Sequence, residues 1–259
     1  MVIGMNTPFT YEFGYSWPIG WFAVVPLVIG GGLAAIACAR GWQRWIVALS
    51  GLVAVWALVA LVFVHGVFRI NLPMELPTPR FLASRGGEVV DVGAGSGRFS
   101  VGLLLARPDV RVTAVDLYEG YWGIDGNTPE RFMANARIAH VAGRARALAG
   151  DARALPLDDD SYDGAISSYA IDHLRRDEIP VALSEVNRVL KPGGEFLLAV
   201  VNADWWMILV SPPIAHHPRA DPARWRRLLE GAGFTILEQG TTPGSLHFLV
   251  RKPAADDDK

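Results

Sequence analysis

A glycine-rich turn between two apolar segments constrains the fold of this chain more than any other feature. Residues 89–98 have the sequence V-V-D-V-G-A-G-S-G-R, in which an apolar run of strand length leads into Gly93, Gly95 and Gly97. Glycine accepts backbone conformations with positive φ, so such a turn lets the main chain approach a ligand closely. Asp116 ends the next apolar run, where a carboxylate can bind a ribose. The segment therefore predicts a nucleotide-binding strand, turn and helix.

Apolar runs of strand length recur along the rest of the chain. They lie at residues 89–92, 111–115, 163–167, 196–201, 234–238 and 246–250. Helix-like segments separate the first five runs, and strands that alternate with helices form a parallel sheet. Only a short turn separates the last two runs, which predicts an antiparallel hairpin at the edge of the sheet. We expect a doubly wound α/β fold whose ligand site lies at the carboxyl ends of the strands, near Asp91, Asp116 and Ser168.

The glycine spacing separates two families of nucleotide-binding proteins. A dinucleotide loop, G-x-G-x-x-G, requires a third glycine where this chain has Arg98, so a nicotinamide-dependent reductase is disfavoured. The segment instead resembles motif I of the class I S-adenosylmethionine-dependent methyltransferases, where an acidic residue stands two positions before the first glycine. Later segments resemble the same family: G-D-A ahead of L-P at 150–156, Y-D-G-A-I-S-S at 162–168 and R-V-L-K-P-G-G at 188–194. The resemblance covers residues 79–251.

This resemblance implies a Rossmann-like methyltransferase domain with S-adenosylmethionine as its cofactor. In the family, the acidic residue matching Asp116 bonds the ribose hydroxyls, and the aspartate matching Asp151 recognises the adenine together with the next backbone amide. The residues expected to bind the cofactor are Asp91, Gly93, Ala94, Gly95, Gly97, Asp116, Leu117, Asp151, Ala152, Ser168 and Tyr169. For Tyr169, a place in the cofactor or acceptor pocket and simple packing remain alternatives.

Two long apolar segments precede this domain. Residues 18–39 and 46–67 carry no formal charge, and each would span about 33 Å as a helix, enough to cross a bilayer core. A signal peptide would have a shorter core and a cationic start, which the chain lacks. Tryptophans mark both predicted membrane faces, namely Trp17, Trp21, Trp42 and Trp45. We expect a transmembrane helical hairpin; a buried hairpin inside a soluble protein is the alternative.

The chain thus divides into an anchor, residues 1–68, a linker, 69–86, a methyltransferase domain, 87–252, and a tail, 253–259. Prolines in the linker favour a stiff extended segment. The basic residues at the two ends of the hairpin give only a slight charge bias. Because S-adenosylmethionine is a cytosolic metabolite, we expect an integral membrane protein whose catalytic domain lies on the cytoplasmic side.

Small residues in the first apolar segment favour close helix packing, and they permit a dimer without requiring one. They are Gly30, Gly31, Ala34, Ala35 and Cys38. The single cysteine excludes an intrachain disulfide and a thiolate metal cluster, and its apolar surroundings predict a packing role. The net charge of −2 gives no sign of a nucleic-acid partner.

Methyl transfer from a sulfonium is an in-line displacement, so a base is needed only if the acceptor must lose a proton. His173, shortly after the run at 163–167, is the candidate base. The alternative is that Asp172 and His173 cap the next helix. His216 and His217 predict a solvated loop, because adjacent residues rarely face one ion, and no metal is expected.

Three other segments are candidates for ligand or membrane contact. Residues 117–127 form a long, aromatic-rich link that can fold over the adenosine. Residues 202–210 contain an apolar run that suits a lid, a contact with the lipid interface or ordinary packing. Residues 222–230 predict a helix with Asp221 as its N-cap. Arginines at and near this helix favour a solvated face over binding of anionic lipid headgroups.

These features predict a membrane-anchored methyltransferase whose acceptor is a lipid or a lipophilic small molecule, because anchoring raises the effective concentration of such a substrate. One alternative is a methyltransferase of a soluble metabolite or of a membrane protein. Another is a non-catalytic membrane module that binds S-adenosylmethionine. The sequence does not distinguish N-, O-, C- and S-methylation.

Overall fold

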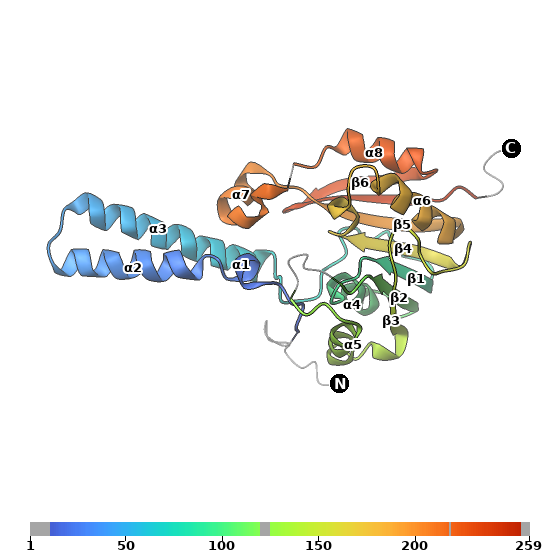
Figure 1. The fold of residues 1–259 in the computed structure, drawn as a ribbon, viewed down its shortest axis with the longest axis horizontal. Helices are drawn as coiled ribbons and strands as arrows, with labels where there is room; N and C mark the ends of the chain where they lie inside the picture. The colour runs from blue at the N-terminus through green and yellow to red at the C-terminus, as the bar shows by residue number, and fades with distance from the viewer. Residues whose placement is uncertain (1–10, 120–124, 218, 255–259) are drawn as a thin grey trace.

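A seven-stranded mixed sheet forms the centre of the larger part of the molecule (Figure 1). The computed structural model describes residues 11–119, 125–217 and 219–254. The strands are β1 (Gly87–Val92), β2 (Val110–Asp116), β3 (Ala145–Ala149), β4 (Tyr162–Ser168), β5 (Leu190–Val201), β6 (Thr235–Thr242) and β7 (Ser245–Arg251). Their order across the sheet is β3-β2-β1-β4-β5-β7-β6. The first five strands run parallel, while β7 lies antiparallel to both β5 and β6.

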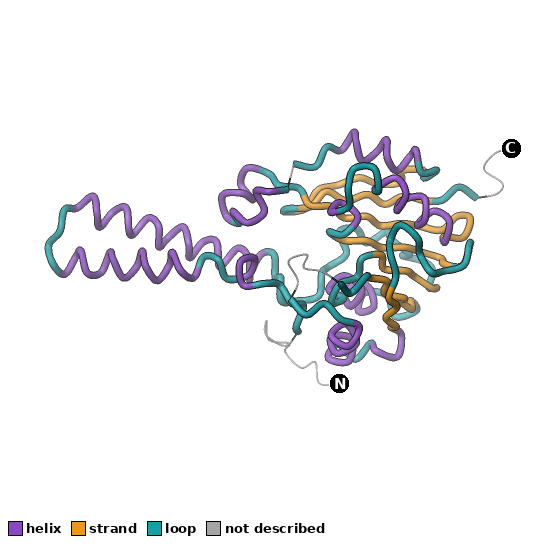
Figure 2. Tube along the Cα trace, in the orientation of Figure 1, coloured by secondary structure: helices purple, strands orange, loops and turns teal. Residues whose placement is uncertain are grey.

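Helices cover both faces of this sheet (Figure 2). On one face lie α4 (Arg98–Ala106) and α5 (Pro129–Ile138), and on the other α6 (Ile179–Val189) and α8 (Pro222–Gly231). The predicted start of α8 is confirmed, since the Asp221 side chain accepts a hydrogen bond from the Ala223 amide with Pro222 in the first turn. Two separate apolar cores result, one under each pair of helices.

The predicted doubly wound fold and its antiparallel edge hairpin are confirmed. The sheet contains one strand, β3, that the apolar pattern did not predict. The strand order reverses direction between β1 and β4, and ligands of such sheets bind in the crevice at this point. The carboxyl ends of these two strands carry the glycine turn and Ser168.

A helical hairpin extends away from the sheet and its covering helices (Figure 1). It consists of α2 (Val24–Ala39), α3 (Arg44–Val62) and the π-helical turn η1 (Phe63–Val67), which continues α3. The two helices lie close together at Gly30, where a Cβ atom would lie 2.9 Å from the Ser50 carbonyl oxygen. The predicted packing role of Cys38 is wrong, because its side chain is exposed and the neighbouring Ala37 is buried instead.

The first predicted membrane helix, residues 18–39, is interrupted. A short helix α1 (Trp17–Gly20) is followed by a turn, and α2 begins only at Val24. Pro26 explains the break: it has no amide hydrogen for the carbonyl of Phe22, and its ring would collide with that carbonyl in a continuous helix. By length and composition, the stretch Arg44–Val67 is the one described helix able to cross a membrane, and 17% of its apolar window is buried. Helix α2 is shorter.

The linker, residues 69–86, contains no helix or strand and packs against α4. The Met74 amide donates a hydrogen bond to the Arg98 carbonyl, 3.0 Å away. Gly102 makes this crossing possible, because a Cβ atom there would lie only 1.8 Å from the Met74 carbonyl oxygen. The linker therefore runs along the domain rather than away from it, and it keeps the base of the hairpin near the carboxyl ends of the strands.

Candidate functional site

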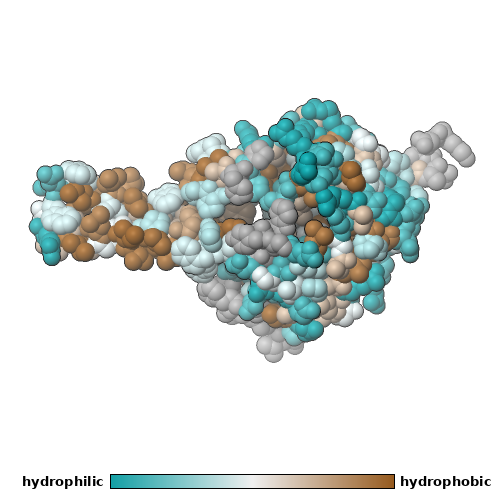
Figure 3. All heavy atoms as spheres, viewed as in Figure 1, coloured by the Kyte–Doolittle hydropathy of each residue, from teal (hydrophilic) through white to brown (hydrophobic). Residues whose placement is uncertain are grey.

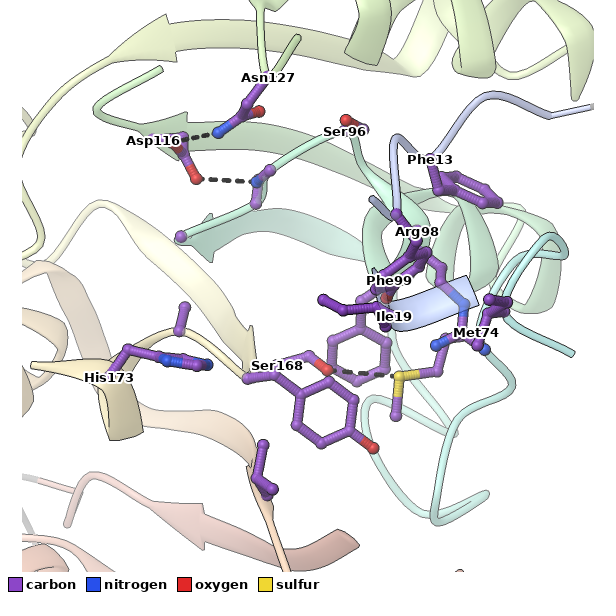
Figure 4. A pocket seen from close by; sticks show the side chains of 18 of the residues that line it. Phe13, Ile19, Met74, Ser96, Arg98, Phe99, Asp116, Asn127, Ser168 and His173 are labelled. Atoms are coloured by element: carbon purple, nitrogen blue, oxygen red, sulfur yellow. Dashed lines mark hydrogen bonds between the residues drawn. The ribbon is translucent and has the colours of Figure 1, made fainter. Parts of the chain in front are cut away.

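A cavity of about 790 Å³ lies where the strand ends meet the base of the hairpin. Figure 4 shows polar side chains such as Asp116 and Asn127 on one side and apolar ones such as Phe13, Ile19 and Met74 on the other. The cavity falls within the range of about 300–1,000 Å³ that is usual for small-molecule sites. One continuous space therefore joins a polar end at the sheet with an apolar end at the hairpin.

The glycine turn between β1 and α4 forms part of the polar end. Gly93, Gly95 and Gly97 all have positive φ, at 75°, 54° and 85°. A Cβ atom on Gly93 would lie 2.2 Å from the Ala170 Cβ, so only glycine fits there. Gly97 faces the other way, against the ring of Phe132, and is the one predicted cofactor residue that does not line the cavity. The side of the turn that Gly97 occupies therefore packs against α5.

Asp116, at the end of β2, holds the glycine turn. One carboxylate oxygen accepts a hydrogen bond from the Gly95 amide at 2.8 Å. The other accepts hydrogen bonds from the Tyr118 amide at 2.8 Å and from the Asn127 side-chain nitrogen at 3.0 Å. Three donors therefore fix the carboxylate at the rim of the cavity (Figure 4).

Asp91, on β1, lines the cavity and is almost completely buried. Its Oδ2 atom accepts a hydrogen bond from Ser100 Oγ at 2.6 Å, while Oδ1 has no hydrogen-bond partner among the described residues. Burial raises the pKa of Asp91 to about 7, against the lowering effect of the Ser100 hydrogen bond, and the charge of Asp116 contributes to the rise. The side-chain oxygens of Ser96 and Asn127 likewise have no described partner. Unpaired polar atoms at three lining residues suit a polar, positively charged ligand.

The other predicted cofactor residues also lie around the cavity. Asp151 lines it, but its carboxylate binds the Arg153 guanidinium at 2.6 Å, and those hydrogen bonds hold its pKa below the usual range. Ser168 Oγ lies 3.3 Å from the Met74 sulfur. The remaining lining residues from the predicted set are Ala94, Leu117, Ala152 and Tyr169. Part of the aromatic-rich link at 117–127 lies outside the described residues.

Three titratable side chains gather beyond the end of β4. His173 ends the short helical turn η3 (Ile171–His173) and lines the cavity, as does His217. The loop predicted at His217 is confirmed, but its side chain is half-buried rather than fully solvated, since its ring lies 4.7 Å from that of His173 in an edge-on arrangement. The Asp172 carboxylate accepts a hydrogen bond from the Val201 amide at 2.8 Å, and burial raises the pKa of Asp172 to about 6. The cluster provides groups that can accept a proton near neutral pH.

Sequence reasoning missed the contribution of the N-terminal segment. Phe13 and Tyr15 line the apolar end, although they lie far from the strand ends in sequence. Asn135 on α5 holds this segment: its side chain bonds the amide and carbonyl of Glu12 and also the carbonyl of Ser96 in the glycine turn. A single asparagine therefore ties the N-terminal segment to the turn.

Arg98 connects the glycine turn to the hairpin. Its guanidinium donates to the carbonyl oxygens of Phe68 at 2.7 Å and Leu72 at 2.9 Å, with a longer contact to Arg69 at 3.3 Å. It also lies 5.9 Å from the ring centre of Tyr15. The residue that breaks the dinucleotide pattern thus contacts both segments that join the hairpin to the sheet.

Comparisons with known proteins agree on this region. Residues 89–194 match a family model described as a methyltransferase domain. The chain is 36% identical over 119 residues to a ubiquinone/menaquinone biosynthesis C-methyltransferase of Paracoccus denitrificans, covering 46% of this chain and 44% of that protein. It is 36% identical over 115 residues to a malonyl-[acyl-carrier protein] O-methyltransferase of Methylococcus capsulatus, covering 44% and 38%. The chain spans less than half of the length of these two relatives.

A solved structure shares the fold. A protein from Methanococcus maripaludis, assigned as an S-adenosyl-L-methionine-dependent methyltransferase, superposes with a TM-score of 0.54 at 19% identity. The match covers 69% of this chain and 82% of the other. At this identity the similarity establishes the fold and nothing further about the reaction.

Proposed function

We propose that this chain, which contains a class I S-adenosylmethionine-dependent methyltransferase domain, is a membrane-anchored enzyme that methylates a lipophilic acceptor. The family match and the fold imply S-adenosylmethionine as the cofactor. The observation that carries the proposal is the single cavity that joins the glycine turn to the apolar base of the hairpin. A polar donor and an apolar acceptor can meet in this one continuous space.

The residues of the polar end fit this cofactor. When bound, S-adenosylmethionine supplies an electrophilic methyl group on a sulfonium. Asp91 offers an unpaired buried carboxylate oxygen to the positive charge of the ligand, and Asp116 offers a carboxylate held at the rim. The chain contributes to catalysis chiefly by fixing donor and acceptor in line, which reduces the entropic part of the barrier.

The surface of the hairpin supports membrane anchoring. Exposed apolar side chains run along α2 and α3, and we call them the apolar flank: Val28, Ile29, Leu33, Leu49, Leu52, Val55, Leu58, Val59 and Val62. Figure 3 shows this hydrophobic surface along most of the hairpin, with polar residues at its tip. An apolar surface of this extent is costly in water and is satisfied by lipid. Since the cofactor is cytosolic, we further propose that the catalytic domain lies on the cytoplasmic side.

The relative from quinone biosynthesis and the apolar end of the cavity favour a lipophilic acceptor. One relative is named for methylation in quinone biosynthesis and the other for methylation of a malonyl group on a carrier protein. One is named a C-methyltransferase and the other an O-methyltransferase, so the proposal names the class of acceptor and not the atom that receives the methyl group. The apolar end of the cavity is suited to the hydrophobic part of an acceptor, and His173 is our candidate for accepting its proton.

The proposal can be tested with the protein in lipid nanodiscs, methyl-labelled S-adenosylmethionine and a total lipid extract. We expect label in the organic phase, lost in Asp116→Ala and kept in Asp158→Ala, which changes an exposed aspartate remote from the cavity. Label in the aqueous or protein fraction would instead identify a soluble metabolite or a membrane protein as acceptor. Cofactor binding without any methylated product would support the non-catalytic alternative.

Cofactor affinity should depend on pH through Asp91. Its pKa of about 7 means that the carboxyl is largely neutral below pH 7, whereas the cationic cofactor favours the ionised form. Binding should therefore strengthen as pH rises, by up to about 100-fold between pH 5 and pH 8, and level off above the pKa. Isothermal titration calorimetry measures this dependence directly.

Asp91→Asn is the control for that experiment, because the amide has a similar shape but does not titrate. Its cofactor affinity should be weak and nearly constant over the same pH range. The same titration should affect the stability of the cofactor-free protein. Because burial raises the folded-state pKa, stability should fall as pH increases from about 4 to about 7 in the wild type and less in the variant. If the affinity of the wild type for the cofactor does not vary with pH, Asp91 does not contact the charge of the bound cofactor.

A further inference from the structure

The apolar end of the cavity is assembled from five separate segments of the chain. The N-terminal segment contributes Phe13, α1 contributes Ile19, the hairpin base contributes Val64 and Phe68, the linker contributes Met74, and α7 contributes Met207. We call this part of the cavity the apolar lobe. Figure 4 shows Phe13, Ile19 and Met74 grouped there, away from Asp116 and Asn127. The lobe is thus built mainly by the parts of the chain that join the predicted anchor to the domain.

The short helix α7 (Trp205–Val210) packs beside the hairpin rather than on the sheet. The Trp56 indole nitrogen on α3 donates a hydrogen bond to the Leu209 carbonyl at 2.8 Å. The ring of Phe63 meets that of Trp206 edge-on at 5.2 Å. These two contacts attach α7 to the end of the hairpin nearest the domain.

The outer side of α7 is strongly apolar and exposed. Trp205 is 78% exposed and Leu209 is 56% exposed. Phe63 and Trp56 lie four and eleven positions before Val67, where the continuous helical stretch ends. The two contacts to α7 are therefore about 6 Å and about 16 Å along the helix from that end. If this stretch spans a bilayer, α7 lies within the leaflet nearest the domain, where an exposed apolar surface is favoured. Helix α7 thus adds exposed apolar side chains beside the hairpin that carries the apolar flank.

The surface is hollowed where α7 and the hairpin base meet the domain (Figure 3). Met207 connects this region to the cavity, because it lies on α7 and also lines the lobe. Gly244, in the turn between β6 and β7, allows the close approach: a Cβ atom there would lie 2.3 Å from the Phe68 ring and 2.9 Å from the Met207 methyl carbon. The lobe therefore borders the surface that the proposed bilayer covers.

We propose that the apolar lobe binds the hydrocarbon tail of the acceptor lipid, which enters sideways from the bilayer between α7 and the base of the hairpin. This inference rests on the proposed function and narrows it. The acceptor is a lipid whose polar reacting group reaches the end of β4, beside Ser168 and His173, while part of its tail stays in the membrane. A lipid bound in this way never exposes its full tail to water, which favours the apolar lobe over a surface groove as its site.

Filling the lobe tests this role. Ile19→Trp should lower the rate of lipid-phase methylation of the total lipid extract in nanodiscs by at least about tenfold, through a higher KM for the lipid. Its affinity for S-adenosylmethionine should stay that of the wild type, because Ile19 lies apart from Asp116 in the cavity (Figure 4). Val28→Trp is the matched control, since Val28 is 66% exposed on the hairpin surface. Unchanged lipid methylation by a folded Ile19→Trp protein would overturn the proposal.

A second measurement does not depend on activity. The wild-type protein is placed in nanodiscs that contain phosphatidylcholine with a diazirine in its acyl chain, irradiated, and mapped for cross-linked peptides. We expect cross-links to lobe residues such as Ile19, Phe68 and Met207, lost in Ile19→Trp and kept in Val28→Trp. Cross-links restricted to the apolar flank would overturn the lobe, even if the lipid extract is methylated. Cross-links in the lobe without methylated lipid would contradict lipid methylation as the function but support the binding of a lipid tail in the lobe.

Discussion

Replacing Asp116 with alanine should weaken S-adenosylmethionine binding by at least about 100-fold and abolish methyl transfer. The carboxylate accepts hydrogen bonds from the Gly95 amide, the Tyr118 amide and the Asn127 side chain. Hydrogen bonds to a charged group contribute about 1.5–3 kcal/mol each, and a loss of about 3 kcal/mol already corresponds to a hundredfold change in affinity. The variant loses both the support of the glycine turn and the carboxylate that the family resemblance assigns to the ribose.

Isothermal titration calorimetry with the cofactor is the direct measurement, with circular dichroism to establish that the variant is folded. Asp116→Asn separates the two roles, because it keeps the volume and one acceptor oxygen but presents an amide group to backbone donors. We expect an affinity between those of the wild type and Asp116→Ala. Asp158→Ala should bind normally. A cofactor affinity of Asp116→Ala within about threefold of the wild type would show that Asp116 only shapes the loop.

The local character of the cofactor motif explains why the polar end was predictable. Gly93, Gly95 and Asp116 derive their positions from the strand ends that precede them, and each lies at the carboxyl end of a parallel strand or in the turn that follows. Glycines that follow an apolar run, and an aspartate that ends the next run, can be recognised in the sequence. Gly97 belongs to the same sequence pattern but packs against Phe132, and this contact is visible only in the structure.

The missed strand and the interrupted helix follow from weaker local signals. Strand β3 has the sequence A-R-A-L-A, and alanine has little preference for strands, so its formation depends on pairing with β2. The helix break depends on one proline inside an otherwise uniform apolar run. Composition predicted the hairpin because hydropathy sums over many residues, whereas the exact helix start depends on a single missing amide hydrogen.

The apolar end could not be predicted because its residues meet only in the folded chain. Phe13 and His217 lie more than 200 positions apart, yet both line the cavity. Contacts between distant segments hold such residues in place. One example is the buried Asn135 side chain, which bonds the main chain of Glu12. No periodicity or motif marks these pairs, so the sequence analysis assigned His217 to a solvated loop.

Replacing Arg98 with alanine should loosen the hairpin from the domain while leaving the sheet intact. The guanidinium bonds the carbonyl oxygens of Phe68 and Leu72, which lie where the hairpin ends and the linker begins. Without it, these carbonyls lose a charged donor, and the junction loses about 3 kcal/mol, since such bonds contribute about 1.5–3 kcal/mol each and these are partly exposed. Hydrogen–deuterium exchange should therefore accelerate at residues 64–76 and remain unchanged in β1 and β4.

This loosening should matter for lipid methylation more than for cofactor binding. The carboxylates at the polar end do not bond Arg98, whereas Phe68 and Met74, beside it, form part of the apolar lobe. Lipid-phase methylation should fall at least about tenfold while cofactor affinity changes by less than about threefold. Arg98→Lys, which keeps the charge but loses the planar fork of donors, should lie between the two proteins. Arg111→Ala, at an exposed position on β2, is the matched control.

The ratio of these two losses decides what the junction does. If cofactor binding and lipid methylation fall together, Arg98 supports the glycine turn and the hairpin is only an anchor. If methylation falls alone, the position of the hairpin relative to the strand ends sets access of the acceptor, because the same side chain that follows the glycine turn also fixes the wall of the lobe. We expect the second result, since the hairpin, the segment before it and the linker supply most of the apolar wall, while the strand ends supply the polar end of the cavity.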